Sequence, residues 1–116
     1  MNRILGRISA ALLSLASIAY SHAIVLSATP AQSQEVSGPD VPISLRFNSR
    51  IDLKRSKLVL VMSDGKQTPL DINDAAARDC LISKAKGLKS GSYVLRWQVL
   101  AIDGHITRGE APFRVK

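Results

Sequence analysis

The side chains best suited to bind a metal ion together are those of two histidines and one aspartate. His105 lies in the tripeptide Asp103-Gly104-His105, near the end of the chain. If the chain is extended there, residues two apart point to the same side, so Asp103 and His105 can converge on one ion. The other histidine, His22, follows an N-terminal segment with the features of an export signal. Cleavage after Ser21 would make His22 the first residue of the exported chain.

Placing a histidine at a free N-terminus changes its chemistry. The α-amine and the ring Nδ1 can then bind the same ion and close a six-membered chelate ring. Together with Asp103 and His105, His22 would bring three nitrogens and one carboxylate oxygen to one ion. This mixed donor set in a near-square arrangement suits Cu(II), which also leads the affinity order of the divalent first-row metals. Zinc prefers tetrahedral geometry and lies below copper in that order, so the residues favour Cu(II).

Residues 1–21 have the three-part order of a secretory signal peptide. Arg3 and Arg7 come first, an apolar stretch runs from Ile8 to Ile18, and Ala19-Tyr20-Ser21 supplies small residues before the cut. The apolar stretch is shorter than the roughly 20 residues of a spanning helix. No later segment is long or apolar enough, so we expect an exported chain without a transmembrane segment once the signal is removed.

The expected organisation is therefore a signal peptide at 1–21 and one domain at 22–116. The domain has 116 − 21 = 95 residues, enough for one modest core. Cleavage after Ala23 would also satisfy the small-residue rule, and it would discard His22.

The exported chain is basic. The full sequence has 16 Lys and Arg against 9 Asp and Glu, and loss of Arg3 and Arg7 leaves 16 − 2 − 9 = +5. No aromatic series suited to base stacking accompanies these charges, and export removes the usual nucleic-acid partner, so no nucleic-acid role is expected. The positive charge is compatible with weak attraction to an acidic partner or to an anionic membrane surface.

Cys80 is the only cysteine. It cannot form an internal disulfide, so the domain must be stabilised by packing. We interpret Cys80 as a small buried side chain in a strand, and prefer this interpretation to a metal ligand or an intermolecular thiol.

Period-two alternation of apolar residues predicts a β fold. Strands are indicated at 41–47, 93–101 and 111–115 by alternation and at 58–62 by a continuous apolar run, with shorter candidates at 24–27, 68–72 and 80–83. The only segment that favours a helix, 73–78, is barely two turns long. We therefore expect an all-β protein, a small antiparallel Greek-key β-sandwich of about seven strands, Ig-like or cupredoxin-like.

These residues together resemble the CopC-type periplasmic copper-resistance proteins. The matching stretches are His22-Ala23, Ser27-Ala28-Thr29-Pro30-Ala31, Leu45-Arg46-Phe47-Asn48, Gly91-Ser92-Tyr93-Val94-Leu95-Arg96-Trp97, Asp103-Gly104-His105, Gly109-Glu110 and Phe113-Arg114-Val115. The resemblance covers nearly the whole exported chain.

The resemblance implies a Greek-key sandwich in the periplasm with a Cu(II) site at His22, Asp103 and His105. It also implies that Trp97 is a core residue and that an inner-membrane CopD-type copper-uptake protein is a partner. Some family members have a methionine-rich Cu(I) site, which Met62 alone cannot build, so we expect a single Cu(II) site. The chain departs from the family at Asn48-Ser49-Arg50, where an acidic residue and proline often stand.

The leading functional hypothesis is a copper carrier or buffer that acts in copper homeostasis or resistance, without catalytic residues. A copper monooxygenase-like enzyme is an alternative because such enzymes also use an N-terminal histidine. Against it, a carboxylate from Asp103 would tend to fill the open coordination position that catalysis needs. A metal-free sandwich that binds another protein is the third reading.

Overall fold

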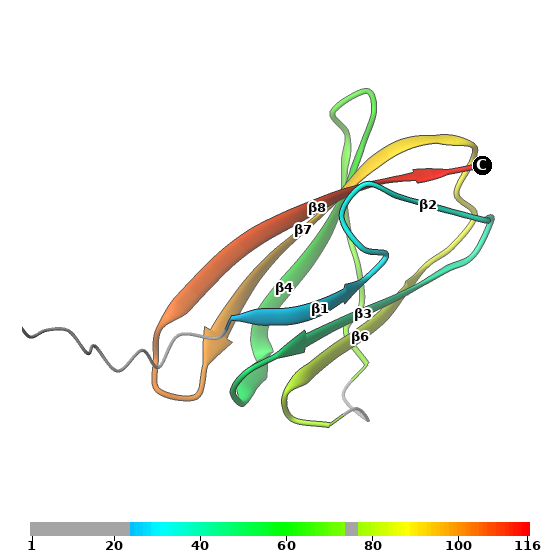
Figure 1. Ribbon diagram of the computed structural model, residues 1–116. Helices are drawn as coiled ribbons and strands as arrows, with labels where there is room; N and C mark the ends of the chain where they lie inside the picture. Colours follow the sequence, from blue (N-terminus) through cyan, green and yellow to red (C-terminus); the bar gives the residue numbers. More distant parts are fainter. Residues whose placement is uncertain (1–23, 74–76) are drawn as a thin grey trace, which may run out of the picture.

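The computed structural model describes residues 24–73 and 77–116, which form two β-sheets packed face to face (Figure 1). The strands are β1 (Val25–Thr29), β2 (Gln34–Val36), β3 (Val41–Phe47), β4 (Ile51–Met62), β5 (Gln67–Pro69), β6 (Cys80–Ala85), β7 (Gly91–Ala101) and β8 (Ile106–Val115). One sheet has the order β1-β3-β6 and the other has the order β2-β8-β7-β4-β5. The chain crosses between the sheets at several connections, so the expected β-sandwich is confirmed.

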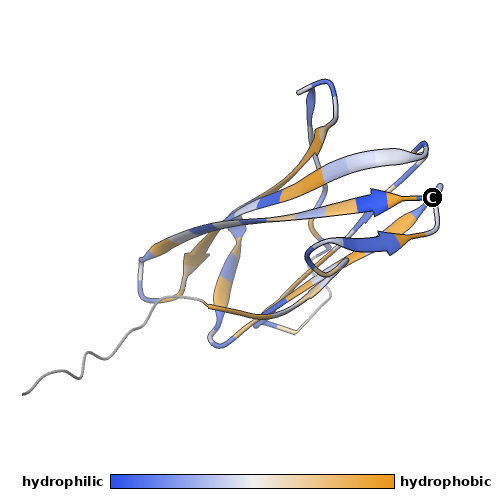
Figure 2. Cartoon of the chain, turned by 45° about the horizontal axis from the view of Figure 1, so that its top comes forward, coloured by the Kyte–Doolittle hydropathy of each residue, from blue (hydrophilic) through white to orange (hydrophobic). Residues whose placement is uncertain are grey.

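The alternation in β3 and β7 explains why these segments pair across the sandwich. In β3, Val41, Ile43, Leu45 and Phe47 are buried while the residues between them are exposed or half-buried. Strand β7 repeats the pattern over its whole length. Figure 2 shows the result as hydrophobic and hydrophilic residues that alternate along the strands. Burying one face of each sheet provides most of the stabilisation of such a two-layer fold.

The core takes side chains from both sheets. Its eighteen buried apolar residues form one cluster, with Leu45, Leu81, Leu95 and Val99 at 0% exposure. Trp97 is 7% exposed and belongs to this cluster, which confirms the prediction of a core tryptophan. Its indole lies against Gly109, its partner in β8, where an added Cβ would come within 2.8 Å of Nε1 and closer still to two ring carbons. Gly109 therefore provides the space that Trp97 occupies.

The shorter predicted strands 24–27, 68–72 and 80–83 correspond to β1, β5 and β6 with shifted limits, and three differences are larger. Strand β4 begins at Ile51 rather than near residue 58, and β8 begins at Ile106 rather than near residue 111. Strand β2 was not predicted, and it pairs with β8 in parallel whereas the other strand pairs are antiparallel. The three residues of β2 show no alternating pattern, so the local sequence does not predict a strand there. They form a strand only because they pair with β8.

Among the described residues there is no helix, and hence none long enough to cross a bilayer. The expected signal peptide at 1–21 and part of the segment 73–78 lie outside the described residues.

Candidate metal centre

Asp103 and His105 lie in the loop that joins β7 to β8, residues 102–105. The backbone closes this loop with hydrogen bonds from Gly104 N to Ala101 O, 2.9 Å, and from Ala101 N to His105 O, 2.8 Å. Gly104 has a φ of +96°, a backbone conformation that residues with a Cβ rarely adopt. A glycine at this position allows the chain to reverse within four residues.

The loop brings the carboxylate and the imidazole together. Asp103 Oδ1 accepts a hydrogen bond from the His105 backbone N–H at 3.1 Å, and Asp103 Oδ2 lies 3.0 Å from His105 Nδ1. The two side chains are 27% and 54% exposed, so solvent reaches both. The predicted pairing of Asp103 with His105 is thus present, but the predicted reason is wrong. The residues lie in a turn, not in an extended strand, and an Asp side chain that bonds the backbone two residues on produces their proximity.

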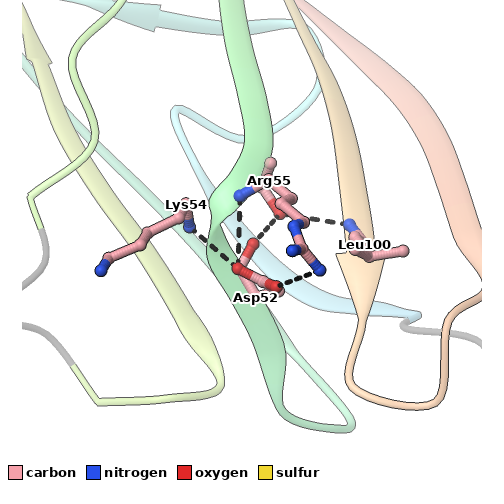
Figure 3. A network of polar contacts seen from close by, with 5 residues as sticks. Asp52, Lys54, Arg55 and Leu100 are labelled. Atoms are coloured by element: carbon pink, nitrogen blue, oxygen red, sulfur yellow. Dashed lines mark hydrogen bonds and ion pairs between the residues drawn. The ribbon is translucent and has the colours of Figure 1, made fainter.

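A polar network connects β4 to the end of β7, the strand that leads into the loop (Figure 3). Ser56 is 7% exposed, and its hydroxyl donates to Asp52 O at 2.7 Å and accepts from Leu100 N at 3.1 Å. Asp52 Oδ1 in turn accepts from the backbone N–H groups of Lys54 and Arg55, at 3.1 and 3.3 Å.

The network closes a large bulge in β4. The four residues 53–56 lie opposite Val99 alone, because Asp52 pairs with Leu100 and Lys57 with Gln98. The Ser56 hydroxyl satisfies Leu100 N, which would otherwise lose its partner at the bulge. The end of β7 is thereby held at Leu100, two residues before the loop begins.

The start of β1 lies at the same end of the sandwich as this loop (Figures 1 and 2). Asn48 Oδ1 accepts a hydrogen bond from Ile24 N at 2.8 Å, and Asn48 N donates to Ile24 O at 2.9 Å. Two residues later, Arg50 O accepts from Ile102 N in the β7–β8 loop at 3.1 Å. The β3–β4 turn, residues 48–50, thus connects both segments.

His22 lies outside the described residues, so its place relative to Asp103 and His105 stays a prediction. Within the described ranges, 24–73 and 77–116, no group of three or more His, Cys, Asp or Glu side chains is arranged to hold a metal ion.

Cys80 opens β6, beside Arg46 of β3, and is half-buried. Its Sγ lies 3.5 Å from Asp79 Oδ1. Burial, and then the neighbouring Asp79 carboxylate, raise the pKa of the Cys80 thiol. The side chain is therefore a neutral thiol near neutral pH, which fits a metal ligand poorly. The prediction of a strand position is confirmed, but the side chain is half-buried at the start of β6 and not fully buried as predicted.

Sequence reasoning did not find two residues that position the candidate site, Ser56 and Asn48. The bulge that gives Ser56 its role has no sequence motif. Asn48 was noted at the end of one stretch that matches the family and at the start of the departure from it, and its position directly after a strand was the available signal.

Comparison with known proteins identifies the family. The CopC domain matches residues 25–116. Protein YobA of Escherichia coli K12 is 27% identical over 100 residues, which cover 84% of this chain and 81% of YobA. Copper resistance protein C of Pseudomonas syringae pv. tomato is 27% identical over 110 residues, 88% of this chain and 86% of that protein.

Solved structures agree with this assignment. The crystal structure of CopC from Methylosinus trichosporium OB3b superposes with a TM-score of 0.74 at 28% identity, covering 82% of this chain and 94% of that one. The match of the CopC domain spans both sheets and the β7–β8 loop. The chain therefore belongs to the CopC family of copper resistance proteins.

Proposed function

We propose that the exported chain binds one Cu(II) ion through the α-amine and imidazole of His22, the carboxylate of Asp103 and the imidazole of His105. The observation that carries the proposal is the contact between Asp103 and His105 at the end of the sandwich where β1 begins. Consecutive Cα atoms are 3.8 Å apart, so His22 cannot be more than about 7.6 Å from Ile24, measured between Cα atoms. Ile24 is tied by Asn48 to the turn that also bonds the β7–β8 loop.

The spacing of the two donors suits a metal plane. Neighbouring ligands in a square arrangement with bonds of about 2 Å lie about 2.8 Å apart. Asp103 Oδ2 and His105 Nδ1 lie 3.0 Å apart. A small rotation of either side chain would let both bind one ion. His22 would add the two nitrogens that a pair of ligands leaves missing.

The role that fits this site best is that of a carrier or buffer in the periplasm. His105 is 54% exposed, which allows a ligand of another molecule to reach the ion. The Asp103 carboxylate would fill the fourth position of the square plane, which an oxidative enzyme would keep open for its reactant. We therefore propose copper homeostasis or resistance, with no catalytic residue. An inner-membrane CopD-type protein would be the acceptor.

Cu(II) titration of two exported forms tests the proposal. One form begins at His22, as verified by mass spectrometry of the secreted protein, and the other begins at Ile24. In competition with a chromophoric chelator at neutral pH, we expect the His22 form to bind one equivalent. The Ile24 form should bind at least about a hundredfold more weakly, because it lacks a two-nitrogen chelate. Equal affinities would overturn the assignment of His22.

A further inference from the structure

Large hydrophobic side chains that remain exposed are confined to one end of the described chain. They are Ile24 at 50%, Leu26 at 60%, Ile102 at 69% and Ile106 at 48%. We call these four residues the apolar collar. They come from two segments, the start of β1 and the β7–β8 loop with its first β8 residue, which are bonded to the same β3–β4 turn. Asp103 and His105 lie between Ile102 and Ile106 in the loop.

The backbone exposes these side chains by specific local geometry. In β1, Val25 pairs with Phe47 and Ser27 with Arg46, so Leu26 is the extra residue of a β-bulge. A bulge redirects a side chain, and here it leaves Leu26 and Ser27 both exposed while Val25 and Ala28 face inward. Ile102 lies in a turn and cannot join the core. Exposed apolar residues gathered at one place mark an interaction surface more often than isolated ones do.

The charged residues around the collar give this surface a net positive charge. Arg50, which bonds Ile102, and Arg108, two residues after Ile106, are exposed, as is Lys54. Of the nearby acidic side chains, Asp52 is paired with Arg55, and Asp103 lies against His105. The three cations Arg50, Lys54 and Arg108 exceed the single negative charge of Asp103, so the rim of the collar is basic and complements an acidic surface.

We propose that the apolar collar and its basic rim form the docking surface for a protein with an apolar patch bordered by acidic residues. That partner gives copper to the site or takes it away, and this last step rests on the proposed function. A second copy of this chain would place two basic rims against each other. Insertion into a membrane would bring the Asp103 carboxylate close to lipid phosphates of the same charge, whereas a protein can supply hydrogen-bond donors there.

Site-specific photo-crosslinking in the native host tests the docking surface. The full chain carries p-benzoylphenylalanine in place of Ile102, or in place of Lys66 as a control. Lys66 is exposed in the β4–β5 turn, beyond the far end of β4. We expect an adduct from position 102 but not from position 66. Mass spectrometry of the adduct should identify a segment of another protein with net negative charge around the linked residue.

Surface variants decide whether the adduct reports docking. Leu26→Ser together with Ile106→Ser should reduce the adduct about tenfold, as should Arg50→Glu together with Arg108→Glu. A linked peptide from this chain itself, a lipid adduct, a basic partner segment, an unchanged yield in both variants or no adduct specific to position 102 would each overturn the proposal.

Copper binding is measured separately on the same variants. The collar variants should keep the Cu(II) affinity of the parent chain, and His105→Ala should keep the crosslink while it loses copper. In the parent chain, failure to bind copper with an intact crosslink would reject the metal site and leave the docking surface standing. Absence of the crosslink in the parent chain, with intact copper binding, would reject the docking surface and leave the metal site standing.

Discussion

The interior of the sandwich and the end that carries the β7–β8 loop follow different rules. In the interior, apolar side chains from both sheets are almost completely buried and follow the strand alternation. At the loop end, a bulge and a turn leave aliphatic side chains exposed and bring Asp103 against His105. Stability thus depends on residues other than the proposed copper ligands, so each property should be removable without the other.

Leu45→Ala should give the largest effect on stability. Leu45 is 0% exposed at the centre of β3, and a leucine truncated in a packed core costs about 2–5 kcal/mol of the free energy of unfolding. Urea denaturation of the metal-free protein measures this cost. Copper affinity should remain that of the parent chain under conditions where the variant is folded. A loss of affinity in the folded variant would show that the two regions are coupled.

His105→Ala should show the opposite pattern. Removing one imidazole ligand should weaken Cu(II) binding by about a hundredfold, or about 2.7 kcal/mol. The free energy of unfolding of the metal-free protein should change by less than about 0.5 kcal/mol, because the side chain is mostly exposed. Isothermal titration and urea denaturation of the same sample provide both numbers. Arg108→Ala, a change nearby on β8 outside the proposed ligands, serves as the matched control for copper binding.

Asn48→Ala probes the junction between the two regions. It removes the side-chain acceptor of Ile24 N, which should cost about 0.5–1.5 kcal/mol of stability. Because Ile24 follows the proposed ligand His22 by two residues, copper affinity should also fall severalfold. Asn48→Asp keeps an acceptor oxygen and should retain most of both. If Asn48→Ala changed stability alone, the start of β1 would not matter for the site.

The smallest expected effect concerns the reactivity of the Cys80 thiol toward an alkylating reagent. Its pKa is raised by burial and by Asp79, so the folded state favours the neutral thiol. The stabilising contribution is present below the ordinary pKa of a thiol and is lost as the pH rises through the raised value. Alkylation by iodoacetamide at about pH 8.5 should be slower in the folded chain than in the urea-unfolded chain. An equal or faster rate in the folded chain would contradict the half-buried, neutral state of Cys80.

Much of the interior could be predicted from the sequence, because alternation records burial residue by residue. The limits of β3 agree with the predicted segment, and β7 differs only at its start. The first half of β4 was missed because the bulge at 53–56 breaks the alternation. Strand β2 was missed because its pairing depends on β8, far along the chain.

At the loop end, the residue types identified the candidate ligands, but the local backbone conformation was not predicted correctly. Asp103 and His105 were selected for their donor atoms and do lie in contact, although a turn rather than a strand brings them together. The part played by Asn48 rests on a hydrogen bond to a residue 24 positions away. No local pattern encodes such a bond. His22 remains a prediction from the signal peptide and the family resemblance.

The most direct test of the proposed site is pulsed electron paramagnetic resonance of the one-to-one Cu(II) complex. The exported chain that begins at His22 should be compared with the same chain acetylated at its α-amine. The unmodified chain should show two bound imidazoles and a third directly coordinated nitrogen, and acetylation should remove that third nitrogen. A spectrum with one imidazole, or one that acetylation leaves unchanged, would contradict a copper site built from His22, Asp103 and His105.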